Sequence, residues 1–222
     1  GVVSLALYNA HTCTALGYFT EAAAKRGVLA FGLTNASPIV AAPGGKTRVL
    51  GTNPIAFAVP DGRGGTAMMF DQSTTTVALG HVTMARAAGR SLPEGWALDA
   101  EGRPTTDPEA ALAGSLVSAG GYKGWGLGLM AEVLAACLGG GTFSAEVAPL
   151  KAAEGAPHDL GQYFLLIDPG QGDFHARMAR LAEIVTQDEG ARMPGQDKRP
   201  SPGAEVPDGL WQQLQDLAGP QA

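Results

Sequence analysis

The chain has 222 residues, of which 45% are hydrophobic and 16% are charged, and its formal net charge is −6. This balance is typical of a chain that folds around one large or two small hydrophobic cores, and it excludes an intrinsically disordered protein. The acidic pI of about 5.1 and the lack of a basic stripe also argue against nucleic acid or an anionic membrane as a partner.

The first elements in chain order are a strand, a helix and a second strand. The apolar run over 2–8 predicts a buried strand. The segment 15–26 predicts a helix, with Thr14 as its N-cap and Gly27 as its C-terminal stop. Residues 28–34 are again strand-like. This order predicts an α/β domain with parallel strand pairing.

Glycine and proline, at 32 and 15 residues, predict sharply turned connections between the later elements. The connection over 35–54 is long enough to suggest a functional loop. A helix over 124–138 is apolar nearly all round, which indicates burial on several sides. The other expected elements are strands over 55–59, 66–70 and 162–168, helices over 74–88, 108–113, 173–187 and 208–218, and an irregular segment over 90–107.

The cysteine content and the hydropathy indicate a cytoplasmic protein. Cys13 and Cys137 are too few for a disulfide framework, which is typical of a reducing compartment. The longest apolar stretches fall well short of a membrane span, and no signal peptide is visible. Because Gly1 leads directly into a core-like strand, whereas chain termini usually fray, we expect further sequence to precede it.

The turn between the first strand and the first helix is the first candidate site. Where a strand ends and a helix begins, free backbone N–H groups and the helix dipole suit an anion. Thr12 and Thr14 offer hydroxyl donors, and His11 can donate a hydrogen bond or carry a proton. One alternative is a simple helix cap with a solvated His11. A metal site of His11 and Cys13 is disfavoured, because no second His/Cys pair has ligand spacing.

Four further segments combine glycines with polar or charged side chains. Each also has a purely structural interpretation, as a turn, a helix cap, a close helix contact or a solvated loop. The segments are 44–54, with Lys46, Arg48, Thr52 and Asn53; 70–74, with Asp71 at a strand end; 120–128, with Lys123; and the basic turn 192–199. The Gly-x-Gly pattern in 120–128 lacks the preceding strand and the later acidic residue of a dinucleotide fingerprint. It therefore predicts close helix packing, with Lys123 as an anion ligand.

Together these segments resemble the malate/L-lactate dehydrogenase type 2 family, which includes ureidoglycolate dehydrogenase, 2,3-diketogulonate reductase, sulfolactate dehydrogenase and Δ1-piperideine-2-carboxylate reductase. Each motif alone is weak, but the set follows the family order over nearly the whole chain and is highly specific. The resembling motifs are Pro43-Gly44-Gly45, Leu50-Gly51-Thr52-Asn53-Pro54-Ile55-Ala56-Phe57, Phe70-Asp71, Pro93-Glu94-Gly95-Trp96, Pro104-Thr105-Thr106-Asp107-Pro108, Gly120-Gly121-Tyr122-Lys123-Gly124 and Met193-Pro194-Gly195.

The resemblance implies a family-specific α/β fold with a mixed sheet, distinct from a Rossmann domain, and a homodimer that binds NAD or NADP near the subunit interface. It implies that 1–145 forms the NAD(P)-binding and substrate domain, on which a C-terminal strand and helices from 146–222 pack. His11 and His81 are the implied catalytic residues, and Thr52 is the implied substrate contact. The implied cofactor contacts are Thr12, Thr14, Phe70, Asp71, Gln72, Tyr122, Lys123, Arg192 and Gly195.

Three departures from the family pattern bear on the chemistry. The N-terminal Ser-His-Gly motif, which carries the family's proton-donating His, is absent here, so that the acid/base is expected before Gly1. Many relatives carry His where this chain has Thr12, and His11 lies one place earlier. His81 stands where relatives carry Asp in the imine-reductase branch or Lys in the hydroxy-acid branch. The substrate is therefore not transferable from any one relative.

The implied activity is hydride transfer between the nicotinamide and C2 of a small 2-oxo or 2-hydroxy acid of the malate/lactate type, with a nearby side chain handling the proton. The alternatives are reduction of a cyclic 2-imino acid and a non-catalytic family remnant. A Rossmann dehydrogenase is disfavoured by the missing fingerprint context. Arg192, Lys198 and Arg199 suit a 2′-phosphate and favour NADP. No metal ion is expected.

Overall fold

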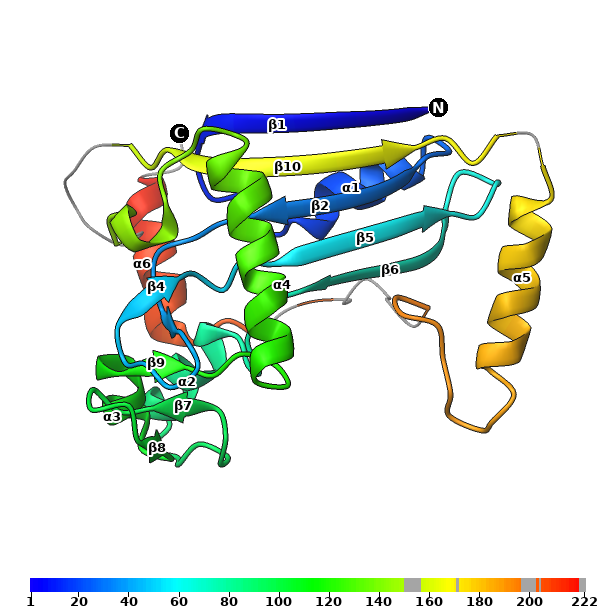
Figure 1. Ribbon diagram of the computed structural model, residues 1–222. Helices are drawn as coiled ribbons and strands as arrows, with labels where there is room; N and C mark the ends of the chain where they lie inside the picture. The colour runs from blue at the N-terminus through cyan, green and yellow to red at the C-terminus, as the bar shows by residue number, and fades with distance from the viewer. Residues whose placement is uncertain (150–156, 171, 197–202, 204, 220–222) are drawn as a thin grey trace.

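The computed structural model describes residues 1–149, 157–170, 172–196, 203 and 205–219, and the strands among them form two five-stranded sheets. Neighbouring strands of the main sheet are antiparallel throughout. In spatial order these strands are β1 (Val2–Ala10), β10 (Leu160–Ile167), β2 (Leu29–Thr34), β5 (Ile55–Pro60) and β6 (Thr66–Gln72), as Figure 1 shows.

The smaller sheet is mixed, because its strands β3 and β9 are parallel and its other neighbours are antiparallel. Its spatial order is β4 (Arg48–Leu50), β3 (Val40–Ala41), β9 (Ser115–Leu116), β7 (Ala97–Leu98) and β8 (Pro104–Thr105). It shares a hydrophobic core with the helices α2 (Leu79–Ala87) and α3 (Pro108–Ala113). This core is built from Val40, Leu50, Val77, Val82, Ala85, Leu92, Ala97, Ala111 and Leu116.

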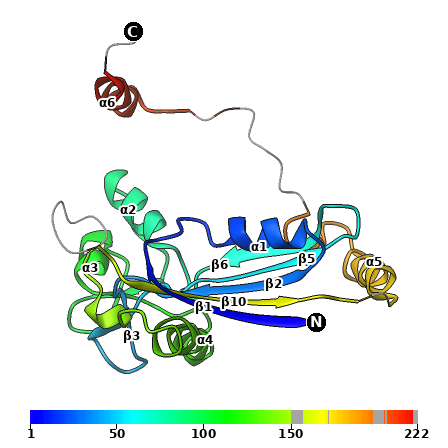
Figure 2. The same cartoon turned by 90° about the horizontal axis from the view of Figure 1, so that it is seen from above.

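Helices cover both faces of the main sheet (Figure 2). Helix α1 (Gly17–Ala24) packs on β2, β5 and β6. On the other face lies α4 (Tyr122–Glu132), which continues as a π-helical turn over Val133–Cys137 that contacts β10, β1 and β2. The π-helical turn lies so close to β10 that a Cβ on Gly161 would stand 1.8 Å from the carbonyl oxygen of Ala135. Only glycine fits there.

The helices α5 (Phe174–Val185) and α6 (Asp208–Ala218) are amphipathic and lie at the periphery (Figures 1 and 2). Every residue of α6 is exposed. Over the part of the chain that the structure describes, none of the helices is long and apolar enough to cross a membrane.

Several expected elements are confirmed. The strands over 28–34, 55–59 and 66–70 correspond to β2, β5 and β6, and the helix over 108–113 has the expected bounds. Its start is fixed as the sequence indicates, because Asp107 accepts hydrogen bonds from the N–H groups of Glu109 and Ala110, while Pro108 stands at the first position.

The expected parallel pairing of the first two strands is wrong. β1 and β2 run in the same direction, but β10 lies between them and pairs antiparallel with both, for example through Phe164 with Leu5 on one side and Gly32 on the other. The expected burial of the first strand is also wrong. β1 is the edge strand of the sheet, and its residues are exposed up to Asn9.

Three expected helices begin or pack differently. α1 begins at Gly17 rather than at residue 15, because Thr14 has a positive φ of 56° and does not cap it. α2 begins at Leu79 rather than at residue 74, because the preceding residues bond to other loops. The helix over 124–138 is buried along one side only, where it faces the sheet. Its other side exposes Leu127, Leu129, Val133 and Leu138.

Candidate active site

A cleft of about 630 Å³ opens where β6 ends and the chain passes through the loop 73–78 into α2. Three predicted site residues, Asp71, Gln72 and His81, line it together. The indole of Trp96 closes one side, with its ring 6.3 Å from the imidazole of His81, and Ala119 closes another. The cleft therefore brings together the end of β6, an edge strand of the main sheet, and His81 of α2. The sequence had placed these residues in separate segments.

The loop 73–78 is fixed by its backbone. The N–H and the hydroxyl of Thr74 both donate to the carbonyl oxygen of Thr52, each at 3.0 Å. The carbonyl of Thr74 accepts from the N–H of Ala119 at 2.9 Å, and the N–H of Thr76 donates to Val117 at 2.8 Å. Thr74 is buried. Through these hydrogen bonds it connects the predicted substrate residue Thr52 to the loop 73–78 and to Ala119, which form two walls of the cleft.

Asp71 links the cleft to the start of α1. Its Oδ2 accepts a hydrogen bond of 2.7 Å from the N–H of Gly17, the first residue of that helix. A carboxylate at a helix N-terminus is favoured by the helix dipole. Gly17 lies so close to β6 that a Cβ there would stand 2.5 Å from Cε of Met69 and 2.9 Å from Cβ of Asp71. The carboxylate thus caps α1, and not the helix α2 that follows it in the sequence.

His11 is not among the residues that line the cleft. Its ring lies edge-on to that of His158, with 5.0 Å between ring centroids, and its carbonyl accepts from the side chain of Gln162. The N–H of Thr12 donates to Nδ1 of His11 at 2.7 Å, so that the neutral ring carries its proton on Nε2. The two predicted catalytic histidines therefore lie in different surroundings.

The loop between β1 and α1 turns sharply at Cys13 and Thr14. The N–H of Ala15 donates to the carbonyl of Cys13 at 2.6 Å, and the hydroxyl of Thr14 donates to the same oxygen at 2.7 Å. Burial raises the pKa of the Cys13 thiol; a backbone hydrogen bond partly opposes this, and the negative charge of Asp71 adds to it. Cys13 is therefore kept as a neutral thiol beside the carboxylate.

Cys13 is expected to react with iodoacetamide more slowly than the exposed Cys137 at mildly alkaline pH, because its raised pKa leaves less of the reactive thiolate. Asp71→Asn should speed the alkylation of Cys13 without reaching the rate of Cys137, since burial is the larger cause. Mass spectrometry of the two peptides measures both rates in one sample. Equal alkylation rates at Cys13 and Cys137 in the unsubstituted protein would contradict the raised pKa of the Cys13 thiol.

The start of α4 is locked to the wall of the cleft. A Cβ on Gly124 would stand 2.4 Å from the carbonyl oxygen of Ala119 and 2.7 Å from that of Thr74. Gly120 and Gly121 precede the helix with positive φ angles of 62° and 64°. The predicted cofactor contacts Tyr122 and Lys123 follow directly. Both are exposed at the first turn of α4, next to the cleft wall at Ala119 rather than within the cleft lining.

Residues 193–195 lie against β6. The N–H of Met69 donates to the carbonyl of Pro194 at 2.9 Å, and Gly195 has a φ of 82° with its Cα close to Met69. The predicted contact Gly195 thus lies beside Met69, which is two residues before Asp71 in β6, and Arg192 stands just before this segment. Lys198 and Arg199 lie outside the described residues. Phe70 is half-buried, and its ring lies tilted at 45° to that of Phe57 within the sheet, with 6.1 Å between ring centroids.

The structure does not support Arg48 as a cation for a substrate carboxylate, nor a metal site that includes His11 and Cys13. The guanidinium of Arg48 donates to the carbonyls of Leu112 and Gly114 at the end of α3, so that it stabilises the helix terminus there. Among the residues that the structure describes, no three His, Cys, Asp or Glu side chains gather as a metal ion would require.

A buried polar cluster of Asn53, Glu132 and Ser144 was missed by sequence reasoning. Glu132 is the one acidic residue in the apolar segment 124–138, and this was the available signal. In the structure the carboxylate is 7% exposed and accepts hydrogen bonds from both other members of the cluster. The cluster lies outside the cleft lining, and its member Asn53 directly follows Thr52 in the chain.

The fold defines a class of mixed α/β protein whose main sheet is antiparallel and lies between helices, unlike the parallel sheet of a Rossmann domain. The family model for malate/L-lactate dehydrogenase matches residues 1–215. The chain belongs to this family.

The named relatives include a hydroxy-acid dehydrogenase and an imino-acid reductase. The chain is 41% identical over 197 residues to the (2R)-3-sulfolactate dehydrogenase (NADP(+)) of Chromohalobacter salexigens, covering 88% of this chain and 59% of that protein. It is 36% identical over 229 residues to the Delta(1)-pyrroline-2-carboxylate reductase of Ancylobacter novellus, covering 98% and 67%. The chain thus spans about three fifths to two thirds of the length of these relatives.

Two solved structures have the same fold. The Δ1-piperideine-2-carboxylate reductase of Pseudomonas syringae pv. tomato superposes with a TM-score of 0.87 at 33% identity, over 98% of this chain and 68% of that one. The sulfolactate dehydrogenase of Methanocaldococcus jannaschii superposes with a TM-score of 0.86 at 31% identity, over 98% and 66%. The expected family-specific fold is therefore confirmed.

Proposed function

We propose that the protein is an NAD(P)-dependent oxidoreductase that interconverts a small 2-oxo acid and its 2-hydroxy acid. The observation that carries the proposal is the cleft that brings Asp71, Gln72 and His81 together beside the Thr52–Thr74 contact. The cleft, about 630 Å³ in volume, is large enough for a small carboxylate and part of a nucleotide. The names of the relatives, which include a dehydrogenase of a hydroxy acid, support it.

The residues of the cleft fit a nicotinamide cofactor and a small acid. When bound, the cofactor supplies or accepts the hydride. The hydroxyl-rich loop 73–78 and the Asp71 carboxylate offer acceptors and donors for ribose hydroxyls, Lys123 suits an anionic group of the cofactor, and Thr52 suits the substrate. His81, whose imidazole lines the cleft against Trp96, handles the proton on the C2 oxygen together with a further acid/base, and His11 assists from outside the lining.

Reduction of a cyclic 2-imino acid is the second candidate activity. It is supported by the relatives named as pyrroline- or piperideine-2-carboxylate reductases. The piperideine-2-carboxylate reductase of Pseudomonas syringae pv. tomato is also a structural match. Both reactions add hydride to an sp² carbon beside a carboxylate, so that the same cleft serves either. The two differ in whether oxygen or nitrogen at C2 takes the proton.

Cofactor choice and assembly complete the proposal. NADP is favoured by the relative named for NADP(+), and Arg192 stands near the segment 193–195 where a 2′-phosphate is expected. We propose a homodimer, since the outer side of α4 exposes Leu127, Leu129 and Val133. We propose a cytoplasmic location, because two cysteines are too few for a disulfide framework. Residues 1–145 are proposed to hold the cofactor and the substrate, with 146–222 as the supporting part.

The activity is tested with the complete gene product and a panel of 2-oxo acids and cyclic 2-imino acids, by the loss of NADPH or NADH absorbance. We expect turnover with at least one 2-oxo acid, and a lower Kd for NADPH than for NADH. His81→Asn should lower kcat by ~10²-fold or more if His81 handles the proton. An exposed histidine away from the cleft, His175, provides the matched control His175→Asn. NADPH binding without turnover of any compound would point to a non-catalytic family member.

A further inference from the structure

We propose that Glu132 is a positioning residue of the cleft, which acts through Asn53 on Thr52 and on the loop 73–78. The proposal rests on the proposed function for its effect on turnover, because only that function makes Thr52 a substrate contact. Its structural part, the transmission of order from α4 to the cleft wall, stands on hydrogen bonds and on the backbone that joins Thr52 to Asn53.

The Glu132 carboxylate is held by donors on both oxygens. Oε1 accepts from the N–H of Ser144 at 2.6 Å. Oε2 accepts from the hydroxyl of Ser144 at 2.6 Å and from Nδ2 of Asn53 at 2.8 Å. The three partners are all donors, so that both carboxylate oxygens serve as acceptors. Burying a carboxyl group lowers the stability of the fold relative to a leucine of similar size. What Glu132 adds is therefore the fixed position of its hydrogen-bond partners.

Asn53 is the residue on which this geometry acts. Its side chain is fully buried, and its backbone has a φ of 33°, in the left-handed region that residues other than glycine rarely adopt. Nδ2 of Asn53 also donates to the carbonyl oxygen of Gly128 at 3.0 Å. The amide is therefore fixed between two points of α4, and this fixes the strained backbone next to Thr52.

Thr52 passes this constraint to the cleft. Its carbonyl oxygen accepts both hydrogen bonds of Thr74, and the carbonyl of Thr74 in turn holds Ala119. The loop that contains Thr74 forms one wall of the cleft, and Ala119 forms another. Glu132 is thus connected by four consecutive contacts to the surface that the substrate and the cofactor would touch, although it is itself buried.

Replacing Glu132 by Gln keeps the size of the side chain but puts an NH2 group where an oxygen accepted. That NH2 group then faces either the N–H of Ser144 or the amide NH2 of Asn53, and two donors repel. The backbone N–H of Ser144 is fixed, whereas the Ser144 hydroxyl can turn to Oδ1 of Asn53, so that we expect the NH2 group on the Asn53 side. Asn53 must then turn its amide and release Gly128, or its backbone must relax. Either change loosens Thr52 and Thr74 without removing any group from the cleft.

The experiment compares Glu132→Gln, Asn53→Ala and the double variant in the complete gene product. Glu132→Gln should raise both the KM for the substrate and the Kd for NADPH, because the loop 73–78 borders the site of each, and it should lower kcat/KM by ~tenfold or more. Because both residues act through one contact, Glu132→Gln should have little further effect in the Asn53→Ala background. The matched control is Glu146→Gln, which removes a nearby exposed acid.

A second measurement does not depend on turnover. Amide hydrogen exchange at Thr74 should accelerate by ~tenfold in Glu132→Gln, while exchange at Ala111, in α3, stays unchanged. If Glu132→Gln does not fold, Ser144→Ala, which removes only the hydroxyl donor, should show the same direction with a smaller change. Unchanged exchange at Thr74 in the variant that folds, or additive effects in the double variant, would overturn the proposal. Faster exchange in a protein that turns over no substrate would instead overturn the proposed function alone.

Discussion

Gly124→Ala is expected to lower the free energy of unfolding by about 3 kcal/mol, and to damage the cleft at the same time. The added Cβ would stand 2.4 Å and 2.6 Å from backbone atoms of Ala119 and 2.7 Å from the carbonyl oxygen of Thr74. Backbone atoms give way less easily than the end of a flexible side chain, so that α4 must move away from the loop 73–78. Urea denaturation followed by circular dichroism measures the loss.

Gly126→Ala provides the control within the same helix. Gly126 is exposed, and a Cβ there would meet nothing within 4 Å. Alanine favours a helix over glycine by about 1 kcal/mol, so that this variant should be as stable as the unsubstituted protein or slightly more stable. The exposure of Gly126 also corrects the expectation that the helix over 124–138 is buried on several sides. If the two variants lost equal stability, the close contact between α4 and the cleft wall would be refuted.

Asp71→Ala is expected to weaken NADPH binding by ~tenfold or more, the effect of losing one hydrogen bond to a charged group. The carboxylate holds the first N–H of α1 and lines the cleft, so that its removal frees the loop that carries Thr12 and Thr14 and takes an acceptor from the site. Asp71→Asn keeps an acceptor for Gly17 and should lose less affinity. Fluorescence titration with NADPH gives both dissociation constants.

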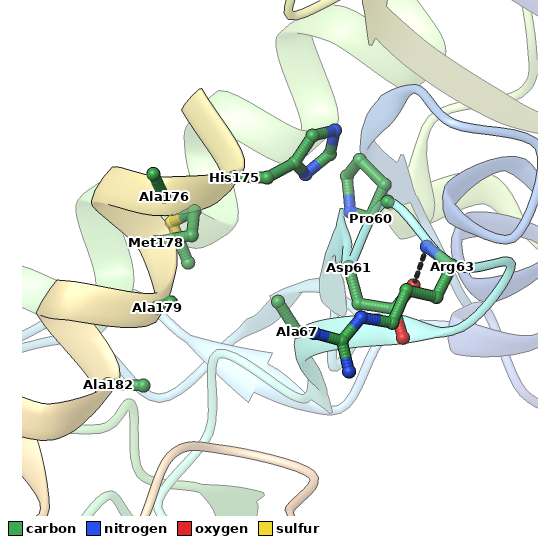
Figure 3. A pocket seen from close by; sticks show the side chains of 10 residues that line it. Pro60, Asp61, Arg63, Ala67, His175, Ala176, Met178, Ala179 and Ala182 are labelled. Carbon is green, nitrogen blue, oxygen red and sulfur yellow. Dashed lines mark hydrogen bonds between the residues drawn. The ribbon is translucent and has the colours of Figure 1, made fainter. Parts of the chain in front are cut away.

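Asp61→Asn is the matched control for this pair. Asp61 also accepts backbone N–H groups, those of Arg63 and Gly65, but in the turn between β5 and β6, at the opposite end of that strand pair. That turn borders a second cleft of about 530 Å³, formed with α5 and lined by His175 and Met178 (Figure 3). NADPH affinity that fell equally in Asp61→Asn and Asp71→Ala would show that Asp71 has no particular role in the site.

Local signals predicted the elements whose start and end are determined by neighbouring residues. Asp107 and Pro108 fixed α3, and the turn at 61–65 fixed the strands on either side of it, because caps and tight turns depend on a few adjacent residues. The identity of the neighbouring strand was not predictable in this way. The segment 2–8 has the apolar content of a core strand, yet its partner is 160–167, and no local signal carries that information.

The candidate site shows the same division. Asp71 and Gln72 were recognised because a strand end followed by polar residues is a local pattern, and the cleft contains both. His11 and His81 were given one role, whereas the structure places only His81 in the cleft lining. Glu132 was overlooked because the apolar period of its helix dominated. Its partners, Asn53 and Ser144, come from distant parts of the sequence and are brought together only by the packing of α4.

The position of β10 also determines the order in which the molecule can assemble during synthesis. β1 and β2 leave the ribosome early, but each has one edge whose partner, the strand over Leu160–Ile167, is made much later. Until then these two edges expose unpaired N–H and C=O groups, although α1 can already pack on β2, β5 and β6. Pairing of Val2 with Ile167 closes one of the longest loops in the chain, which makes it a slow step. The nascent chain is therefore most prone to misassociation in the interval before β10 emerges, and a chaperone that shields strand edges would act in that interval.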